Sequence, residues 1–529
     1  MSRSLSFGVV ATVTSLAVLA PWPRVLSGTE PVGLYADARD VVARQDSDVY
    51  DGVWHFWWTA RAVSEKVDPM FCPLIFHPSG ASLSLHNIGW TSTLLHAVSG
   101  FPSNPVRALN ISLFLGTLMT FAAAALLARQ WGAGGEGAML SGMIMALTPS
   151  RIAHLYQHYN IAQTGWVLLA LFFITRYLRK GRGGAMIAVF TALATLESLY
   201  HSLLVALGFI AVLVLLRTEI SGKRMLKAGI LMACAMIAAG CWFIPRHGAT
   251  PTDNYTWREA VHWSAEPVSY LLPSSFGLGA AAFGFPLKYP WMPNTFEGQV
   301  SSGITVLLVF SAFCVKRRKL SLAVVSLGIL LLSFGPLLKW NGSPTPLPLP
   351  WMLPARVPLL AQARVPARLA LLFGGLTAVT AGVVFHHLKG AVRWVLLALI
   401  AFELTIPRLS TVSASFPGGI LHARGPVLDI PAGSMTRITA FYQTHHRHPR
   451  LTAFLARGGE EALSSAGLSN LLMGDSSMVT DGTLRETAAE TVLYHRMLLS
   501  RRERLFYDSL YAPAFPEASP EESVWVWHR

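Results

Sequence analysis

The chain has 529 residues, of which 52% are apolar and only 13% are Asp, Glu, Lys or Arg. An average soluble domain carries about 25% of these four residues, and the mean hydropathy of this chain is +0.45. A soluble enzyme and a disordered chain are both excluded, because the few charges could not cover a core of this size. The four cysteines are too scattered for a disulfide framework, and no Cys/His cluster has zinc spacing.

Apolar runs close to the length that crosses a bilayer recur along the sequence. They predict about eleven transmembrane helices, at about 5–22, 105–128, 136–149, 161–178, 185–199, 201–216, 228–245, 301–315, 320–338, 369–385 and 394–407. The first run also fits a cleavable signal, since Val18-Leu19-Ala20 precedes Pro21. We favour an uncleaved first span.

The net charge of +14 would suit a nucleic-acid partner only if it were gathered on one soluble surface. With a cytoplasmic N-terminus, the short inner loops hold sixteen basic and two acidic residues, which is the whole excess. Such a bias in short loops sets membrane orientation. The sequence therefore predicts no nucleic-acid partner, a cytoplasmic N-terminus and a multi-pass membrane protein.

Three long segments fall on the outer side, at about 24–104, 246–300 and 339–366. The first is acidic and rich in aromatic residues, which suit a membrane interface. Within it, 49–67 is long enough for a helix lying along that interface. The third is very rich in proline, so we expect extended chain there.

The composition changes after residue 408, which divides the chain into a membrane domain, 1–408, and a tail, 409–529. The tail has 23 charged residues among 121, with nearly balanced signs. It contains a strand-like stretch at 427–431, a helical stretch near 486–508 and an alternating apolar pattern at the end. We predict a small α/β C-terminal appendage outside the membrane.

Two carboxylates in the first outer segment, Asp46 and Asp48, are candidates for chemistry. They lie two residues apart beside a cluster of tryptophans, where they could act as a general base on a hydroxyl or hold a metal. The alternative is a solvated acidic loop in which Asp48 caps the following helix.

A second group of candidates follows the third span: Arg151, His154, His158 and Asn160. His154 and His158 are four residues apart and would share a helix face, where they could bind a phosphate or a sugar. The alternative is an interfacial cap. A zinc site is not predicted, because no third ligand is near in the sequence.

Charged residues also mark the ends of later spans. Glu197 interrupts an apolar run near Tyr200, so it must face a polar cavity or a structural partner. Arg364 and Arg368 open the tenth span and would suit a lipid phosphate, or they anchor the helix at the interface. In the tail, Tyr442 to His446 forms either a polar recognition loop or a turn of a folded domain.

Several patterns in this sequence recur in bacterial polytopic membrane proteins related to the GT-C glycosyltransferases. They are Trp54-x-x-Trp57-Trp58, Phe76-His77-Pro78-Ser79-Gly80, Pro149-Ser150-Arg151-x-x-His154 with His158-Tyr159-Asn160, Glu197 to Tyr200, Glu266 to Pro273, Ser333-Phe334-Gly335-Pro336, Ala363-Arg364-Val365-Pro366-Ala367-Arg368 and Tyr442-Gln443-Thr444-x-His446. The chain resembles this family over most of its length.

The resemblance implies a GT-C-like fold and the use of polyprenyl-phosphate sugars. It also implies that Asp48 or Asp46 takes the acceptor proton during inverting transfer, while His154, Arg364 or Arg368 stabilises the leaving phosphate. Tyr442 and His446 would then approach the acceptor.

We therefore predict a membrane glycosyltransferase that acts on the outer face and uses a lipid-linked sugar donor. The acceptor is a glycan, a lipid or a protein, the remaining partners are membrane lipids, and no cofactor is assigned, with a divalent metal left open. Two alternatives stay open: a transporter or flippase for lipid-linked glycans, which would need charged residues at mid-membrane, and a non-catalytic envelope assembly protein.

Overall fold

The computed structural model describes residues 3–34, 47–84, 86–99, 103–244, 257–316, 319–357, 363–430, 437–452, 488–499, 504–505, 508–509, 511–516 and 522–529. The helices of the membrane part are α1 (Arg3–Leu19), α2 (Pro23–Ser27), α3 (Asp48–Glu65), α4 (Trp90–Ser99), α5 (Pro105–Gln130), α6 (Gly135–Leu147), α7 (Pro149–Leu155), α8 (Tyr159–Ala162), α9 (Gly165–Lys180), α10 (Gly184–Glu197), α11 (Leu199–Leu216), α12 (Gly222–Gly240), α13 (Trp257–His262), α14 (Leu278–Phe283), α15 (Ile304–Lys316), α16 (Leu320–Ser333), α18 (Ala370–His387) and α19 (Gly390–Leu404). The C-terminal part adds α20 (Arg437–His446). The strands are β1 (Phe71–Cys72), β2 (Ala81–Ser82), β3 (Leu337–Trp340), β4 (Ser343–Pro348), β5 (Val427–Ile430), β6 (Thr491–Tyr494) and β7 (Trp525–His528).

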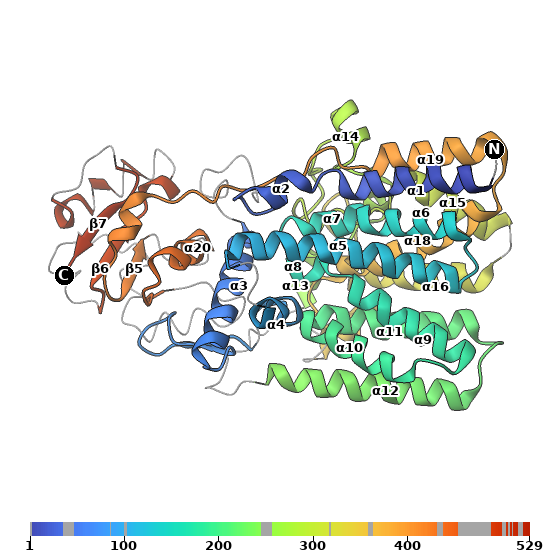
Figure 1. Ribbon diagram of the computed structural model, residues 1–529, viewed down its shortest axis with the longest axis horizontal. Helices are drawn as coiled ribbons and strands as arrows, with labels where there is room; N and C mark the ends of the chain where they lie inside the picture. Colours follow the sequence, from blue (N-terminus) through green and yellow to red (C-terminus); the bar gives the residue numbers. More distant parts are fainter. Residues whose placement is uncertain are drawn as a thin grey trace.

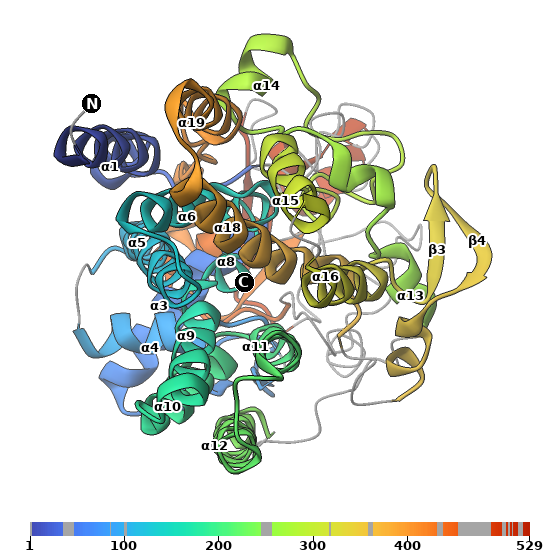
Figure 2. The ribbon, with the colours of Figure 1, turned by 90° about the vertical axis from the view of Figure 1, so that its right-hand side faces the viewer.

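The long helices run side by side, with the N-terminus at one end of the bundle and the C-terminal sheet beyond the other (Figure 1). Helix α6 packs between α5 and α18, and α9 joins this group to α10, α11 and α12. The end-on view shows the same helices as a ring of neighbours (Figure 2). The loops that line the candidate site all lie at the end of the bundle nearest the C-terminal sheet.

Six described helical segments are long and apolar enough to cross a membrane: Leu5–Ser27, Pro105–Gln130, Tyr159–Lys180, Leu199–Leu216, Gly222–Phe243 and Pro366–His387. Four shorter apolar helices accompany them: α6, α10, α15 and α16. Each of the eleven apolar runs in the sequence overlaps one helix of the bundle. Eleven crossings remain a prediction, because the shorter helices do not span a bilayer by length alone.

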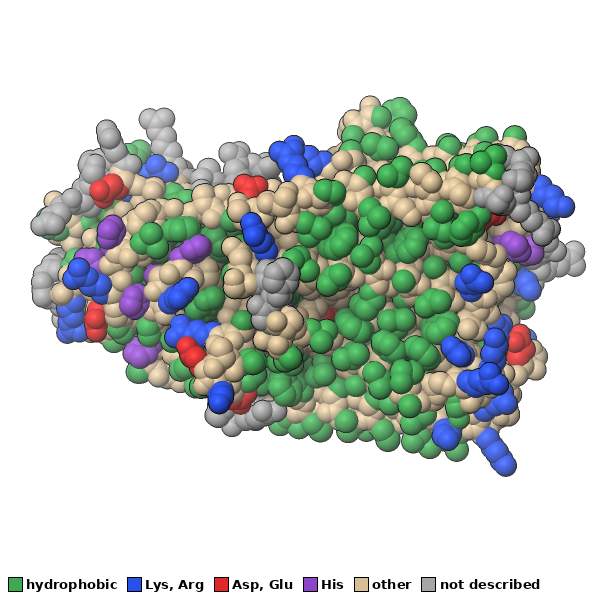
Figure 3. Space-filling model, viewed as in Figure 1, with side chains coloured by type: hydrophobic (Ala, Val, Ile, Leu, Met, Phe, Trp, Pro, Cys, Tyr) green, Lys and Arg blue, Asp and Glu red, His purple; other side chains and the backbone are tan. Residues whose placement is uncertain are grey.

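The surface of the bundle is apolar where lipid would contact it. Leu115 and Ile210 are both 56% exposed, and Leu226 is 65% exposed. Apolar side chains form a broad band over the helices, whereas Lys and Arg gather at the end of the bundle that holds the N-terminus (Figure 3). An apolar surface of this extent would be unstable in water, and the chain is a membrane protein.

Helix α3 lies across the end of the bundle rather than along it (Figure 1). Its bounds, Asp48–Glu65, match the helix predicted at 49–67. It packs against α4, α5 and α20, and eleven of its eighteen residues are buried. A helix buried by neighbours on several sides is a fixed support for side chains at its first turn.

The C-terminal strands form a sheet in the order β5-β6-β7, with β5 parallel to β6 and β6 antiparallel to β7. The strand predicted at 427–431 is present as β5, and the terminal alternation forms β7. The helix predicted near 486–508 is wrong over 491–494, which form strand β6. The β-branched and aromatic residues Thr491, Val492 and Tyr494 favour a strand between two partners.

The stretch from Tyr442 to His446 is neither a loop nor a turn. It is the C-terminal half of α20, and Tyr442, Gln443, Thr444 and His446 are buried there. The helix is stabilised because its side chains pack against α3, a contact between segments almost 400 residues apart that a local pattern does not reveal. The proline-rich segment, expected to be extended, forms the β3–β4 hairpin followed by short 3-10 turns.

Candidate active site

A cavity of about 290 Å³ lies where α3 and α20 meet the loops that precede α8, α15 and α18. Six charged side chains line it: Asp48, Asp51, Glu297, Arg364, Arg368 and Arg437. Three formal negative charges therefore face three positive ones. Ion pairs in a partly desolvated cavity are much stronger than exposed pairs, so these charges strongly influence one another.

Asp48 is the first residue of α3, and its position differs from the predicted N-cap. The N-cap is Ser47, whose Oγ accepts a hydrogen bond from the Val49 backbone N–H at 3.4 Å. Because Ser47 caps the helix, the Asp48 carboxylate lines the cavity instead. Its Oδ1 lies 2.8 Å from Nε of Arg437, and its Oδ2 lies 3.2 Å from Nε2 of His158. Asp46 lies outside the described residues.

The charge state of Asp48 follows from these neighbours. Burial raises the pKa of the carboxyl, but the Arg437 guanidinium and the His158 imidazole outweigh it, so the pKa lies well below its usual range. The backbone N–H of Asp48 also donates to Oε1 of Gln157 at 2.8 Å. The Asp48 carboxylate is thus ionised and held by two side chains, while Gln157 holds its backbone.

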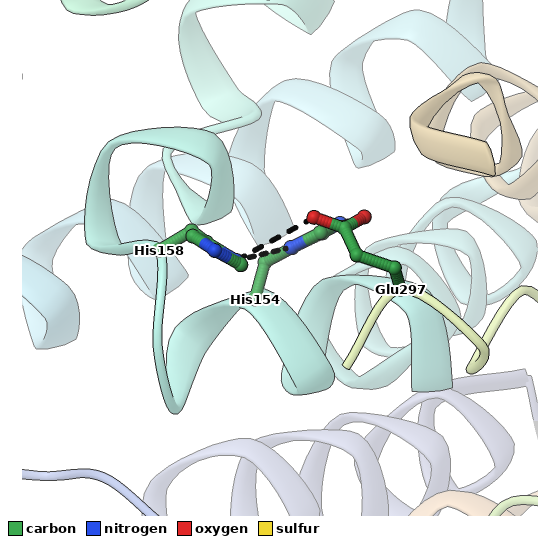
Figure 4. Close-up of side chains that lie close together, drawn as sticks. All are labelled: His154, His158 and Glu297. Atoms are coloured by element: carbon green, nitrogen blue, oxygen red, sulfur yellow. Dashed lines mark hydrogen bonds and ion pairs between the residues drawn. The ribbon is translucent and has the colours of Figure 1, made fainter. Parts of the chain in front are cut away.

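His154 and His158 meet as predicted, but not on a continuous helix. Helix α7 ends at Leu155, and a turn brings His158 back so that the two Nδ1 atoms lie 3.2 Å apart. Glu297, from the loop before α15, completes a group of three (Figure 4). Its Oε2 lies 3.7 Å from His154 Nε2, and its Oε1 lies 3.8 Å from His158 Nδ1.

These three side chains could hold a divalent cation. Their ligand atoms lie within 4.8 Å of one another, and imidazole and carboxylate are suitable ligands for zinc and related metals. Burial lowers the pKa of His154 to about 3, so that imidazole stays neutral and able to ligate. The fold therefore supplies the third ligand, Glu297, that the spacing of the histidines lacked.

An arginine already neutralises Glu297. Arg368 donates from Nη2 and Nε to Oε1 of Glu297 at 2.6 Å and 3.0 Å. Burial raises the pKa of the Glu297 carboxyl, but Arg368 and the two histidines outweigh it and hold the pKa at about 2. Within the described residues, Oε2 accepts no hydrogen bond. A cation at this group would thus bind beside the guanidinium and use the second oxygen.

Arg364 and Arg368 lie on the same wall of the cavity. The Arg368 guanidinium covers the Tyr200 ring at 4.5 Å, and Tyr200 Oη accepts the Val365 backbone N–H at 3.0 Å. Arg364 lies 3.4 Å from Glu259 in a half-exposed pair. Tyr200 therefore supports the wall, while the two arginines present charge to the cavity.

A neutral part of the lining was mostly not predicted. It contains His55, His86, Asn87 and Tyr159, together with the predicted Asn160. Tyr159 Oη lies 3.1 Å from His55 Nδ1 and accepts the Gly89 backbone N–H at 2.8 Å. Burial holds the pKa of His55 well below its ordinary value and lowers that of His86 to about 4. Neutral donors and acceptors beside aromatic rings suit the hydroxyl groups of a sugar.

Six predicted site residues do not line the cavity: Arg151, His154, Glu197, Tyr200, Tyr442 and His446. Of these, His154 and Tyr200 contact residues that do line it. Arg151 is buried and donates to the backbone oxygens of Ala146 and Ala162 and to Thr117, so it joins helices. Glu197 accepts from the N–H and Oγ of Ser92, at the start of α4.

Tyr442 and His446 also lie away from the cavity lining. Tyr442 contacts Met497 through its hydroxyl at 3.7 Å, and its ring lies 5.4 Å from that of His495. His446 Nδ1 accepts the His448 backbone N–H at 3.1 Å. Both side chains face the interior of the C-terminal part.

The overall fold has counterparts among solved structures. The oligosaccharyltransferase of Archaeoglobus fulgidus superposes with a TM-score of 0.50 and 9% identity, over 100% of this chain and 74% of that one. The mycobacterial arabinofuranosyltransferase AftD gives a TM-score of 0.50 and 12% identity, over 100% of this chain and 40% of that one. This is the GT-C fold.

The GT-C fold confirms the family resemblance seen in the sequence, and at these identities it establishes architecture alone. This chain spans well under half the length of AftD. No protein-family model matches the sequence. No curated protein matches it either.

Proposed function

We propose that this protein is a membrane glycosyltransferase that moves a sugar from a polyprenyl-phosphate donor to an acceptor hydroxyl, with inversion at the anomeric carbon. The observation that carries the proposal is the cavity itself, in which an ionised carboxylate, two arginines and a neutral polar wall face one another. The reaction takes place on the outer face of the bacterial inner membrane, with the segment 409–529 on the same side.

Different residues of the cavity carry out different parts of the transfer reaction. The acceptor oxygen attacks the anomeric carbon while the bond from that carbon to the phosphate oxygen breaks. Asp48, with Asp46 as the neighbouring candidate, takes the acceptor proton. Arg364 and Arg368 stabilise the charge that grows on the departing phosphate, an effect that is large in a desolvated site. His55, Tyr159 and Asn160 bind hydroxyl groups of the sugar.

The trio of His154, His158 and Glu297 gives this site a place for a divalent cation. An ion there would lie beside Asp48 and the arginines, where it would supply additional positive charge for the phosphate. The residues of the chain would still orient the acceptor and accept its proton.

The experiment that tests this function measures polyprenyl-phosphate sugars and surface glycans by mass spectrometry in a strain that lacks the protein. A lipid-linked sugar should accumulate and one glycan should lose that sugar. Restoring the wild-type chain should reverse both changes, and restoring Asp48→Asn should reverse neither. Unchanged lipid-linked sugars and glycans in the deletion strain would refute the proposal.

A transporter of lipid-linked glycans is the second candidate, because a larger cavity of about 630 Å³ lies among α9, α11, α16 and α18. It is lined mainly by apolar side chains and reaches Arg179, Arg217 and Lys319 at one end. Transport would survive Asp48→Asn, whereas sugar transfer would not. Purified protein in vesicles with a fluorescent lipid-linked sugar distinguishes the two activities.

A further inference from the structure

The last fifth of the chain contributes a charged residue to the candidate active site. Arg437 is the first residue of α20, and it lines the same cavity as Asp48. Its Nε lies 2.8 Å from Oδ1 of Asp48 and 3.6 Å from Oδ2 of Asp51. These carboxylates are three residues apart on the first turn of α3, so one guanidinium serves both.

Arg437 reaches the cavity because α20 is fixed to α3 by buried contacts. Trp54 Nε1 donates to Oε1 of Gln443 at 2.8 Å, and Gln443 Nε2 donates to the Leu74 backbone oxygen at 2.8 Å. The rings of Tyr50 and Phe441 pack with centroids 5.6 Å apart. The Arg437 side chain is 21% exposed and that of Asp48 is 32% exposed, so their ion pair is only partly buried at the edge of this packed interface.

The two oxygens of Asp48 have different partners. Arg437 lies against Oδ1, whereas His158 lies against Oδ2. Together they fix the plane of the carboxylate. Without Arg437, Oδ1 would be free to rotate and the neighbouring charges of Asp48 and Asp51 would repel each other along one helix face. Arg364 and Arg368 would not replace it, because they pair with Glu259 and Glu297.

We propose that Arg437 is a positioning residue, which holds the Asp48 carboxylate in the orientation that accepts the acceptor proton, so that the segment after residue 408 completes the catalytic site. This inference rests on the proposed glycosyl transfer. The positioning role distinguishes Arg437 from Arg364 and Arg368, the two arginines that would contact the phosphate. Loss of Arg437 should lower kcat without changing KM for the donor, whereas loss of a phosphate contact should also weaken donor binding and raise that KM.

The test uses full-length protein, with transfer from a polyprenyl-phosphate sugar as the readout. Arg437→Ala should lower kcat by about 10²-fold, the lower end of what general-base catalysis supplies, with little change in donor KM. The kcat of Arg437→Lys should lie between the kcat of the wild type and that of Arg437→Ala. Added guanidinium ions should restore part of the activity of Arg437→Ala, because they can occupy the space beside Asp48. Guanidinium should not accelerate the wild type.

Arg61→Ala is the matched control. Arg61 pairs with Glu65 at 2.7 Å on the last turn of the same helix, and that pair is exposed. This variant should transfer sugar at the wild-type rate. Membrane abundance and thermal unfolding of each variant separate a folding defect from a catalytic one, and Arg437→Lys keeps the charge if the alanine variant unfolds.

Three outcomes would overturn the inference: wild-type kcat in Arg437→Ala, a raised donor KM with unchanged kcat, or a folded, abundant Arg437→Ala that guanidinium does not rescue. If the wild type itself transfers no sugar while the deletion strain keeps normal glycans, the proposed function fails instead. The two failures are therefore distinguishable.

Discussion

His158 Nε2 lies 3.2 Å from Oδ2 of Asp48, although Asp48 begins α3 and His158 lies in the turn before α8, 110 positions later. The same imidazole lies 3.8 Å from Oε1 of Glu297. His158 thus links the first outer segment to the loop before α15. Substitution of His158, Asp48 or Glu297 should change the electrostatic environment of the other two, since charges in one desolvated network are coupled.

The base assignment predicts that Asp48→Asn transfers sugar ~10²–10⁴-fold more slowly, with normal membrane abundance. Asparagine keeps the size and much of the hydrogen bonding of aspartate but cannot accept the proton. Purified protein, a lipid-linked donor and a soluble acceptor provide the measurement. Glu65→Gln, at the other end of α3, is the control and should have no effect. A wild-type rate in Asp48→Asn would refute the assignment of Asp48 as the general base. The charge of Asp48 would then only stabilise the start of α3.

The arginine wall predicts a different kinetic effect. Arg364→Gln should weaken donor binding by about tenfold, because a partly exposed phosphate contact of ~1–2 kcal/mol is lost. The pair with Glu259 is half-exposed, so the fold should tolerate the change. Titration with polyprenyl phosphate alone gives the binding constant. An unchanged affinity would place the phosphate elsewhere in the cavity.

The buried histidines predict how stability changes with pH. The pKa of His154 is lowered to about 3 and that of His86 to about 4, so both stay neutral in the folded state below pH 6.5, where an unfolded histidine gains a proton. The unfolded state then binds more protons, and the free energy of unfolding falls as the pH decreases from 6.5 to about 4. Each histidine contributes a slope of about 1.4 kcal/mol per pH unit.

The ionisation of Glu297 changes the free energy of unfolding in a lower pH range. Its pKa of about 2 lies below the ordinary 4.5, so its stabilisation is complete above pH 4.5 and is lost only as the pH falls toward 2. Between pH 6.5 and 4.5, His154→Gln should therefore flatten the dependence of the melting temperature on pH. His422→Gln, at an exposed position, should leave it unchanged. Parallel curves for wild type and His154→Gln would contradict the account.

The orientation can be tested with single cysteines and an impermeant thiol reagent in intact cells. Ser221→Cys, exposed between α11 and α12, should react only after the membrane is opened. Ser343→Cys, exposed on β4, should react from outside. Ser301, just before α15, is unsuitable as an external probe, because it is only 1% exposed and would stay unlabelled for that reason alone. The opposite pattern at Ser221 and Ser343 would reverse the topology.

A chain that ends at Pro407 should insert into the membrane and transfer no sugar. The bundle keeps its own packing, but the cavity loses Arg437, and α3 loses the buried contact of Trp54 with Gln443. Membrane fractionation gives the first result and the transfer assay the second. Activity in the truncated chain would show that the segment 409–529 is dispensable, and failure to insert would show that the membrane part depends on it.

Local patterns predicted the helices well because bilayer burial demands long apolar runs, and each of the eleven runs overlaps a helix of the bundle. The interfacial helix α3 and strand β5 were predicted for the same kind of local reason. The cavity was predicted only in part. Asp48, His154, His158 and Asn160 carry visible polar signals near aromatic residues, and Arg364 and Arg368 open an apolar run.

Glu297, Arg437 and His55 were missed because their significance depends on neighbours far away in the chain. Glu297 is one acidic residue in a loop until the fold brings it to His154. Arg437 meets Asp48 across 389 positions. The signal that could have identified Glu297 is that no other acidic residue occurs between 267 and 300, a stretch rich in aromatic residues and proline. No comparable signal marks Arg437.

The hydrogen bond from Trp54 to Gln443 also sets an order of events during biosynthesis. Trp54 leaves the ribosome early, and its buried partner is synthesised only after the helices between them. Until then, the indole N–H and the first turn of α3 wait at the membrane surface without their final partners. The cavity therefore cannot be complete until the chain has been synthesised beyond residue 443.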